Sequence, residues 1–161
     1  QQFPIAVLIP KSAEDIEIAL AIANESGIPV LPRGGGTSQC GQTTGTALVI
    51  DNSKHFRKIL SSDLSDPDRA TIEVEPGMVL DHLNAHLKSY GLWYPVDVST
   101  GAQATIGGMA GNNSCGSRSI AYGNMVHNVV GASAWLSDGS LLDFGPVSGL
   151  AAGRAAGIAG P

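Results

Sequence analysis

Apolar positions in the first fifty residues predict one helix followed by two short strands. Four of them recur at the spacing of a single helix face: Ile16, Ala19, Leu20 and Ala23. Ser12 precedes this helix as an N-cap with acidic residues after it, and Gly27 stands at its C-terminal end. The apolar runs 28–31 and 46–50 are typical of buried strands. We therefore expect a compact β–helix–β unit in which the helix leads into two neighbouring strands.

The middle of the chain alternates between strand and helix patterns. Residues 70–75 alternate apolar and polar positions, which predicts a half-buried strand. Apolar residues every four positions predict a helix over 79–87, and Gly91 is placed to end it. Residues 55–60 fit neither pattern clearly, whereas the polar residues 61–69 predict an exposed turn.

A hairpin is expected near the end of the chain. Residues 129–136 and 141–144 have the composition of strands, and Asp138-Gly139 between them is a hairpin signal. Residues 145–161 are rich in Gly and Ala and show little periodicity, so we expect a linker or a frayed end there.

Composition narrows the class of protein. The 161 residues are 43% hydrophobic and 14% charged, which favours a folded body over disorder. A net charge of −5 argues against nucleic acid as a partner, because such partners favour a basic face. No long apolar run or signal peptide is visible, so no transmembrane segment is expected. Two cysteines are too few for a disulfide framework, which favours a reducing compartment, the cytoplasm.

A glycine-rich loop follows the first predicted strand. It holds seven candidate cofactor-binding residues: Pro32, Arg33, Gly34, Gly35, Gly36, Thr37 and Ser38. Glycines let a backbone approach a ligand closely, and successive N–H groups in such a turn can bind an anion. The planar guanidinium of Arg33 suits phosphate oxygens. Our hypothesis is that this loop holds the pyrophosphate of a nucleotide cofactor; a flexible surface turn is the alternative.

Two familiar phosphate-binding loops do not fit this segment. The Rossmann pattern requires a third glycine where Gln39 stands, and the P-loop requires a lysine where Gln42 stands. A phosphate bound here must therefore be held by another architecture.

A second informative stretch runs over residues 96–130 and is rich in Gly, Ser, Thr and Asn. Thr105 is placed to cap a short helix over 106–111, in which Gly107 and Gly108 each cost about 1 kcal/mol relative to Ala. Such a cost is tolerated where another backbone or a flat ligand must come close. A long loop with no partner is the alternative, but loops of this length without a function are uncommon in compact domains.

Taken together, these stretches resemble the FAD domain of the vanillyl-alcohol-oxidase or PCMH type. Within it they are most similar to the branch of glycolate oxidase subunits, D-lactate dehydrogenases and D-2-hydroxyglutarate dehydrogenases. The loop at 32–38 resembles the first FAD-pyrophosphate loop, and the similarity runs in order from about Pro4 to Phe144. The other matching positions are Val74-Glu75-Pro76-Gly77, Thr105-Ile106-Gly107-Gly108, Asn113, Gly116, Tyr122-Gly123, Val129 and Ser137-Asp138-Gly139.

The resemblance implies an α+β fold with FAD between two α+β subdomains, about residues 1–60 and 68–144, in an FAD-binding domain of residues 1–144. The last strands would follow Pro161, so the fold would be incomplete at its C-terminus. Besides residues 32–38, the resemblance implies that seven residues line the cofactor: Thr100, Thr105, Gly107, Gly108, Asn112, Ser114 and Gly116.

The resemblance also implies a chemistry, namely hydride transfer from a 2-hydroxy acid to flavin N5, with electrons passed to an acceptor. In this branch the metal-binding histidines and the catalytic base lie in a substrate domain that this chain lacks, so no catalytic or metal-binding residue is assigned. The implied location is the cytoplasm, either free or peripheral to the inner membrane. Thr37 stands where covalently flavinylated members often carry histidine, so we expect non-covalent FAD.

Two other functions stay open from the sequence. One is a flavoenzyme like UDP-N-acetylenolpyruvoylglucosamine reductase, although the signature of that enzyme is not visible. The other is a non-catalytic nucleotide-binding or assembly module that kept the fold.

Several single residues allow either a functional role or an ordinary structural role. His82 and His86 share a helix face but lack a third metal ligand nearby, so a solvated face is preferred. His127 lies near the second segment, and a simple hydrogen-bonded role is preferred over polarising the flavin. A disulfide between Cys40 and Cys115 would need their Cα atoms within about 7 Å, and small buried thiols are preferred. Arg33 is expected to pair with phosphate in preference to a carboxylate such as Asp51.

Overall fold

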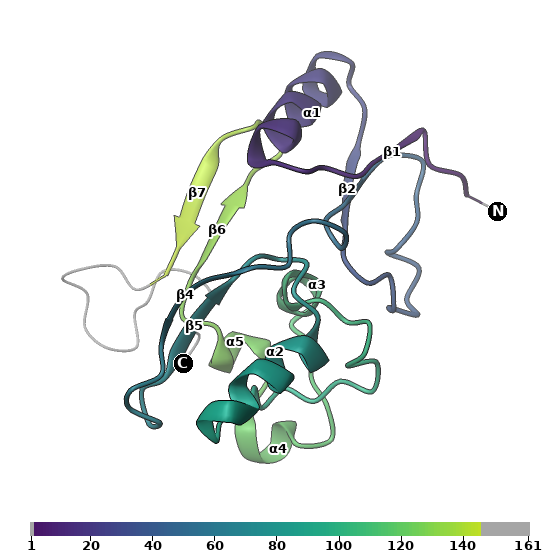
Figure 1. The fold of residues 1–161 in the computed structure, drawn as a ribbon. Helices are drawn as coiled ribbons and strands as arrows, with labels where there is room; N and C mark the ends of the chain where they lie inside the picture. The colour runs from purple at the N-terminus through teal and green to yellow at the C-terminus, as the bar shows by residue number, and fades with distance from the viewer. Residues whose placement is uncertain (1, 146–161) are drawn as a thin grey trace.

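The computed structural model describes residues 2–145 and begins with a three-stranded parallel sheet covered by one helix. Its strands are β1 (Ala6–Leu8), β2 (Val30–Arg33) and β3 (Leu48–Asp51), in the order β1-β3-β2. Helix α1 (Ala13–Glu25) connects β1 to β2 and packs on the sheet (Figure 1). The predicted pairing of the two strands after the helix is confirmed, with Val30 opposite Leu48.

Helix α1 forms as its sequence predicts. The Ser12 side chain accepts a hydrogen bond from the N–H of Asp15, and the Asp15 carboxylate accepts one from the N–H of Ser12, which completes a capping box. The four residues of the predicted apolar face are all buried, and three of them pack against Ile50 of β3. Gly27 follows the helix with a φ of 63°, which favours glycine.

A second layer combines an antiparallel strand pair with a helix. The strands are β4 (Ile59–Asp63) and β5 (Thr71–Val74), and the helix is α2 (Leu80–Leu87), extended by a short 3-10 turn, η1 (Lys88–Tyr90). Met78, Leu83 and Leu87 form the core between the helix and the strands. Gly91 ends η1 with a φ of 71°, as expected. The prediction for 61–69 is wrong in its first part, because β4 extends to Asp63 by pairing with β5.

Three short helices follow. They are α3 (Ile106–Gly111), α4 (Ser119–Tyr122) and α5 (Met125–Asn128). Thr105 caps α3 through its side chain, as predicted. Their core contains Val96, Met109 and Met125, each 2% exposed or less.

Tyr94 lies between this core and the core of the second layer. Its hydroxyl donates a hydrogen bond to the carbonyl of Asn128 at 3.2 Å. Burial raises the pKa of Tyr94 to about 12, because a phenolate would lose its hydration there. Tyr94 therefore joins the two clusters through apolar packing and the hydrogen bond of its hydroxyl.

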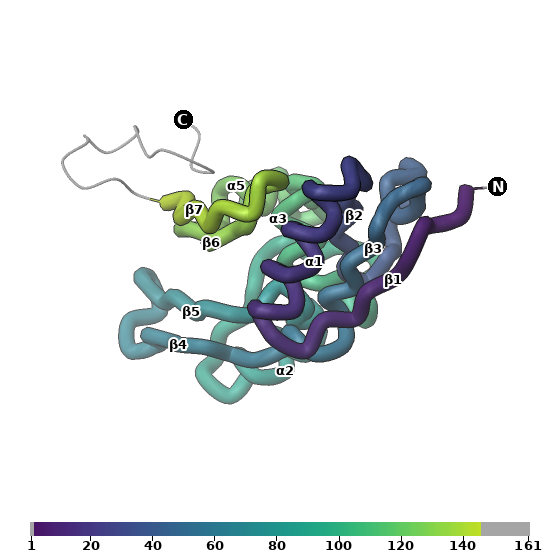
Figure 2. Tube along the Cα trace, turned by 90° about the horizontal axis from the view of Figure 1, so that it is seen from above, coloured from purple at the N-terminus to yellow at the C-terminus, as the bar shows by residue number. Residues whose placement is uncertain are grey.

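The chain closes with the hairpin of β6 (Ala132–Trp135) and β7 (Leu141–Phe144), turned at Gly139 with a φ of 84°. The hairpin lies beside α1, where Trp135 packs into the α1 core and the Asn24 amide donates to the carbonyl of Ser137 at 2.7 Å (Figure 1). Figure 2 shows this hairpin and the β4–β5 pair as separate arms on the side of the molecule opposite β1. The subdomain boundaries near residues 60 and 68 stay a prediction, and the predicted tail lies, apart from Gly145, outside the described residues.

Candidate functional site

The two glycine-rich segments are about seventy residues apart in sequence, and they contact each other at several positions. A β-carbon on Gly34 would overlap the hydroxyl of Thr105, and one on Gly35 would overlap the carbonyl of Gln103. Further along the loop, the Thr100 hydroxyl donates to the Thr37 hydroxyl at 3.2 Å. The loop at 32–38 and the segment at 100–116 therefore form one site.

These contacts correct the physical reason for Gly34 and Gly35. From the sequence, the missing side chains were expected to make room for a ligand. In the structure they make room for the second segment, because the space a β-carbon would take is filled by Thr105 and Gln103. A larger residue at Gly35 would therefore disturb the fold itself and would not report on ligand binding alone.

The backbone of the loop presents hydrogen-bond donors that the protein does not use. Residues 34–38 are all half-buried. Within residues 2–145, none of their five N–H groups donates to a protein acceptor. A row of neighbouring backbone N–H groups that make no bond within the protein can bind an acceptor-rich group. A diphosphate provides such acceptors.

The charge at this row comes from Arg33. Its guanidinium lies against the loop, since a β-carbon on Gly36 would come within 2.7 Å of Arg33 Nε. Gly36 adopts a φ of 66°, which bends the loop toward this side chain. Within residues 2–145, no ion pair joins Arg33 to Asp51 or to any other carboxylate. The guanidinium is thus held beside the unused N–H groups, and its predicted pairing with phosphate stays a prediction.

A further unmet polar atom lies at the same end of the sheet. The N–H of Asn52 donates to the carbonyl of Arg33 at 2.9 Å, just after β3 ends. The Oδ1 of Asn52 is buried and has no hydrogen-bond partner among residues 2–145. Buried polar atoms are almost always paired, and an amide oxygen can only accept, so this atom needs a hydrogen-bond donor and would not bind a phosphate oxygen.

Helix α3 takes part in a different way from the loop. The N–H of Gly107 donates to the carbonyl of Pro76 at 2.9 Å, and the N–H of Gly108 donates to the Thr105 hydroxyl at 3.4 Å. A β-carbon on Gly107 would lie 3.0 Å from the Pro76 Cα, so this glycine allows α3 to pack on the turn after β5. The protein therefore uses both amides, and an anion would be bound by the 34–38 loop.

The rest of the second segment is held by one side-chain bond and by backbone contacts. The Gln42 amide donates to Asn112 Oδ1 at 3.2 Å, which joins the two segments again beyond the glycine loop. Ser114 accepts the N–H of Met125 at its carbonyl, and Gly116 lies against the backbone of Asp97. Sequence reasoning missed Gln42 and Asp97 as parts of the site. The only signal would have been their positions, Gln42 shortly after the first loop and Asp97 at the start of the stretch 96–130.

The residues therefore fit a flavin dinucleotide at its diphosphate. Unused N–H donors and a guanidinium without a carboxylate partner lie together where the loop meets the second segment, within the described residues 2–145. A family model described as FAD binding domain matches residues 4–145. The chain belongs to this FAD-binding domain family.

Curated relatives agree with the family. The chain is 37% identical over 150 residues to D-2-hydroxyglutarate dehydrogenase from Pantoea ananatis, covering 91% of this chain and 14% of that protein. It is 37% identical over 148 residues to glycolate oxidase subunit GlcD from Bacillus subtilis, covering 90% of this chain and 30% of that protein. A mitochondrial D-lactate dehydrogenase [cytochrome] from Kluyveromyces lactis is 34% identical, with 88% and 24% covered. The chain thus spans 14–30% of the length of these relatives.

Solved structures show the same fold. The chain matches 6-hydroxy-D-nicotine oxidase from Arthrobacter nicotinovorans with a TM-score of 0.72 and 22% identity, covering 88% of this chain and 30% of that one. It matches alkyldihydroxyacetonephosphate synthase with a TM-score of 0.73 and 21% identity, covering 91% and 26%. The expected α+β PCMH-type fold is confirmed.

Other candidate residues of the FAD-binding domain take plain roles. His127 is exposed, and its Nδ1 accepts the N–H of Asn124 at 3.1 Å, so its hydrogen-bonded role is confirmed. His86 lies 5.5 Å from the Tyr90 ring, and residues 2–145 contain no group of three or more metal-ligating side chains around it or His82. The expectation of buried thiols is wrong, since Cys40 and Cys115 are both free and exposed.

The helices within residues 2–145 are short or polar. None of them has the length and apolar character needed to cross a bilayer.

Proposed function

We propose that this chain is the FAD-binding domain of a flavin-dependent oxidoreductase that oxidises a 2-hydroxy acid. The single observation that carries FAD binding is the row of unused N–H groups at 34–38 with the guanidinium of Arg33 beside it, which pairs with no carboxylate within residues 2–145. The relatives named after D-2-hydroxyglutarate, D-lactate and glycolate support the substrate class.

The residues proposed to hold FAD form two groups, the first loop and the second segment, with different contacts to offer. Residues 34–38 would donate backbone N–H groups to the diphosphate, and Arg33 would neutralise part of its charge. Pro32 lies in β2, directly before Arg33 and the loop. The facing side of the site would be formed by Thr100, Thr105, Gly107, Gly108, Asn112, Ser114 and Gly116. Of these, Thr100, Thr105 and Asn112 already contact the first loop or its continuation.

In the reaction, this domain would orient FAD and enclose its diphosphate. FAD, when bound, supplies hydride acceptance from the substrate carbon. Thr37 would leave FAD non-covalently held, because its hydroxyl accepts from Thr100 and offers no imidazole for a covalent bond. The substrate site and the contact with an electron acceptor would lie in further parts of a longer chain. The exposed free thiols support a reducing compartment, the cytoplasm, whether free or at the inner membrane.

The cofactor assignment is tested by one charge-removing substitution. Arg33→Gln in the full chain should weaken FAD binding by about 10- to 100-fold, which corresponds to one charge-assisted contact. The matched control is Arg69→Gln, because Arg69 is exposed in the turn between β4 and β5, away from the loop. Titration of FAD, followed by flavin absorbance, gives both affinities. Equal affinities in the two variants would overturn the role of Arg33.

The substrate class is tested separately. Anaerobic mixing of the full-length flavoprotein with a panel of D-2-hydroxy acids should bleach the flavin band with at least one of them. A flavoprotein that retains FAD but is bleached by none would refute the substrate proposal and leave the cofactor assignment standing.

A further inference from the structure

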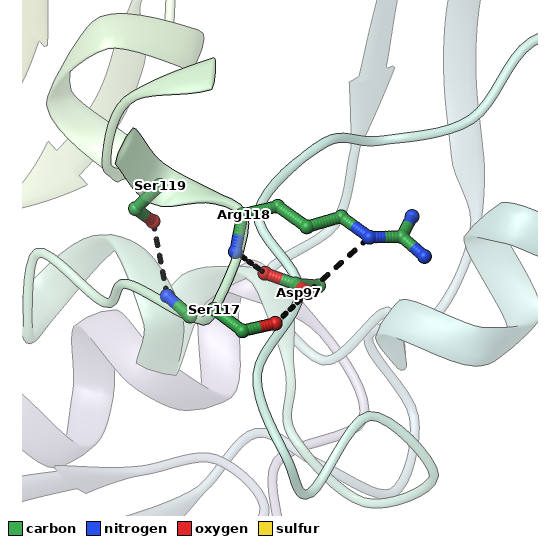
Figure 3. A network of polar contacts seen from close by, with 5 residues as sticks. Asp97, Ser117, Arg118 and Ser119 are labelled. Carbon is green, nitrogen blue, oxygen red and sulfur yellow. Dashed lines mark hydrogen bonds and ion pairs between the residues drawn. The ribbon is translucent and has the colours of Figure 1, made fainter. Parts of the chain in front are cut away.

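The carboxylate of Asp97 collects three contacts from a single turn of the second segment. It accepts the hydroxyl of Ser117 at 2.8 Å and the N–H of Arg118 at 3.1 Å, and it pairs with Arg118 Nε at 3.6 Å (Figure 3). We call Asp97, Ser117 and Arg118 the Asp97 clamp. These bonds lower the pKa of Asp97, chiefly through the N–H of Arg118, so the carboxylate stays charged at neutral pH.

The backbone reinforces the clamp. A β-carbon on Gly116 would overlap the Asp97 carbonyl oxygen and lie 2.5 Å from its carbonyl carbon, so only glycine allows this approach. On its other side, the N–H of Gly116 donates to the Ser119 hydroxyl at 3.0 Å (Figure 3). The chain is therefore fixed in front of Asp97 by side-chain bonds at 117–118 and by close packing at 116.

Arg118 is braced from a second direction. Its Cζ lies 4.9 Å from the centroid of the Trp93 ring, a cation–π distance. Trp93 in turn meets the ring of Tyr122 edge-on at 5.3 Å. Because Trp93 and Asp97 belong to the same connection between α2 and α3, the turn at 117–118 is anchored to that connection at two points.

The clamp holds the part of the site that lacks regular structure. Residues 112–118 lie between α3 and α4 and include Asn112, Ser114 and Gly116. Upstream of the clamp, Asn113 Oδ1 accepts the N–H of Val126 at 3.0 Å, and Asn112 contacts Gln42. Asn113 has a φ of 46°, a conformation that non-glycine residues seldom adopt without support. The shape of this segment therefore depends on polar bonds more than on a buried apolar core.

We propose that Asp97 is a positioning residue for the cofactor: through Ser117, Arg118 and Gly116 it holds residues 112–116 in the conformation that receives FAD. The proposal rests on the proposed function. Exposed ion pairs contribute little to global stability, so losing the carboxylate loosens this segment more than it unfolds the domain. The loss therefore appears in the binding and environment of the flavin.

The test compares two aspartates with similar local bonding. Asp97→Asn in the full chain raises the FAD dissociation constant by about tenfold, the value of one charge-assisted hydrogen bond, and alters the visible circular dichroism of the bound flavin. The control is Asp63→Asn. Asp63 also accepts a serine hydroxyl and N–H, from Ser65 at 2.6 and 3.3 Å, but it lies at the end of β4. The control leaves both readouts at their wild-type values.

Each outcome has a defined meaning. Wild-type affinity and an unchanged flavin spectrum in Asp97→Asn would overturn the positioning role, even if the variant were less stable. If Asp97→Asn does not fold, Ser117→Ala removes only one bond and should raise the dissociation constant by about threefold; no change there would overturn the proposal. A wild-type chain that binds no FAD would overturn the proposed function together with this inference, whereas flavin-loaded wild type with an unaffected variant overturns the inference alone.

Discussion

Gly34 and Thr105 meet so closely that a β-carbon on the glycine would lie 3.3 Å from the Thr105 Cβ and overlap its hydroxyl. Thr105 is 2% exposed and caps α3, so it has no free space into which to move. The glycine loop after β2 is therefore packed tightly against the start of α3.

This contact predicts the result of adding one methyl group. Gly34→Ala should lower the free energy of unfolding by about 1–3 kcal/mol, the usual cost of overpacking, in urea denaturation without FAD. Gly45→Ala is the matched control, since a β-carbon placed there would have no atom of residues 2–145 within 4 Å and its φ is not positive. A Gly34→Ala variant as stable as Gly45→Ala would contradict the close packing of Gly34 against Thr105.

The hydrogen bond between Thr100 and Thr37 predicts a coupling between the two segments. Thr37→Val and Thr100→Val should each lower the free energy of unfolding by about 0.5–1.5 kcal/mol. Because both remove the same 3.2 Å bond, the double variant should lose less than the sum of the two. Urea denaturation of the four proteins measures the coupling, and strict additivity would show that the two hydroxyls do not interact.

Tyr94 predicts an alkaline limit to stability. Its pKa is raised to about 12 by burial, above its ordinary value of 10.0. The neutral phenol is the form the fold favours, so its contribution is complete below pH 10 and is lost as the pH rises through about 12. Tyr94→Phe removes the bond to Asn128 and should cost about 1 kcal/mol at neutral pH. It should also remove a late step from the ultraviolet tyrosine titration, and a titration curve that keeps this step would contradict the assignment.

The contribution of Asp97 to stability depends on pH in the opposite direction to that of Tyr94, because it is lost in acid. Its pKa is lowered below the ordinary value of 3.8, so its contribution is present above that value and is lost as the pH falls through the lower folded pKa. Wild type and Asp97→Asn should therefore differ by a small amount in thermal midpoint at neutral pH and converge in strong acid. A difference that stays constant across this range would mean that the charge of Asp97 is not involved.

The sequence predicted best where structure is local. The Ser12 cap, the apolar face of α1, the Thr105 cap and the turn at Gly139 depend on neighbours within a few residues, and all four are present. Predicted strand positions were shifted by up to three residues. The strand expected from residue 129 begins at Ala132 as β6, because residues 129–131 connect α5 to β6.

Elements that depend on distant partners were missed. β1 has only three residues and exists because β3 pairs with it, and β4 exists because β5 does. The helices α4 and α5 each have four residues, too few for a periodic pattern.

In the site, too, local features were predicted and long-range contacts were not. The two glycine-rich segments were identified from composition and family resemblance, and their convergence is observed. Their internal division of roles depends on tertiary contacts. Sequence could not show that Gly107 packs on Pro76, that Arg33 folds over Gly36, or that Asp97 fastens the turn at 117–118.

The most direct test follows backbone amides as FAD is added. In nitrogen–proton correlation spectra of the full chain, FAD should shift the signals of residues 34–38 and of residues 112–116 together, with one saturation curve. Signals in the turn between β4 and β5 should stay in place. Shifts confined to one segment, or none in either, would contradict the claim that both segments enclose one FAD.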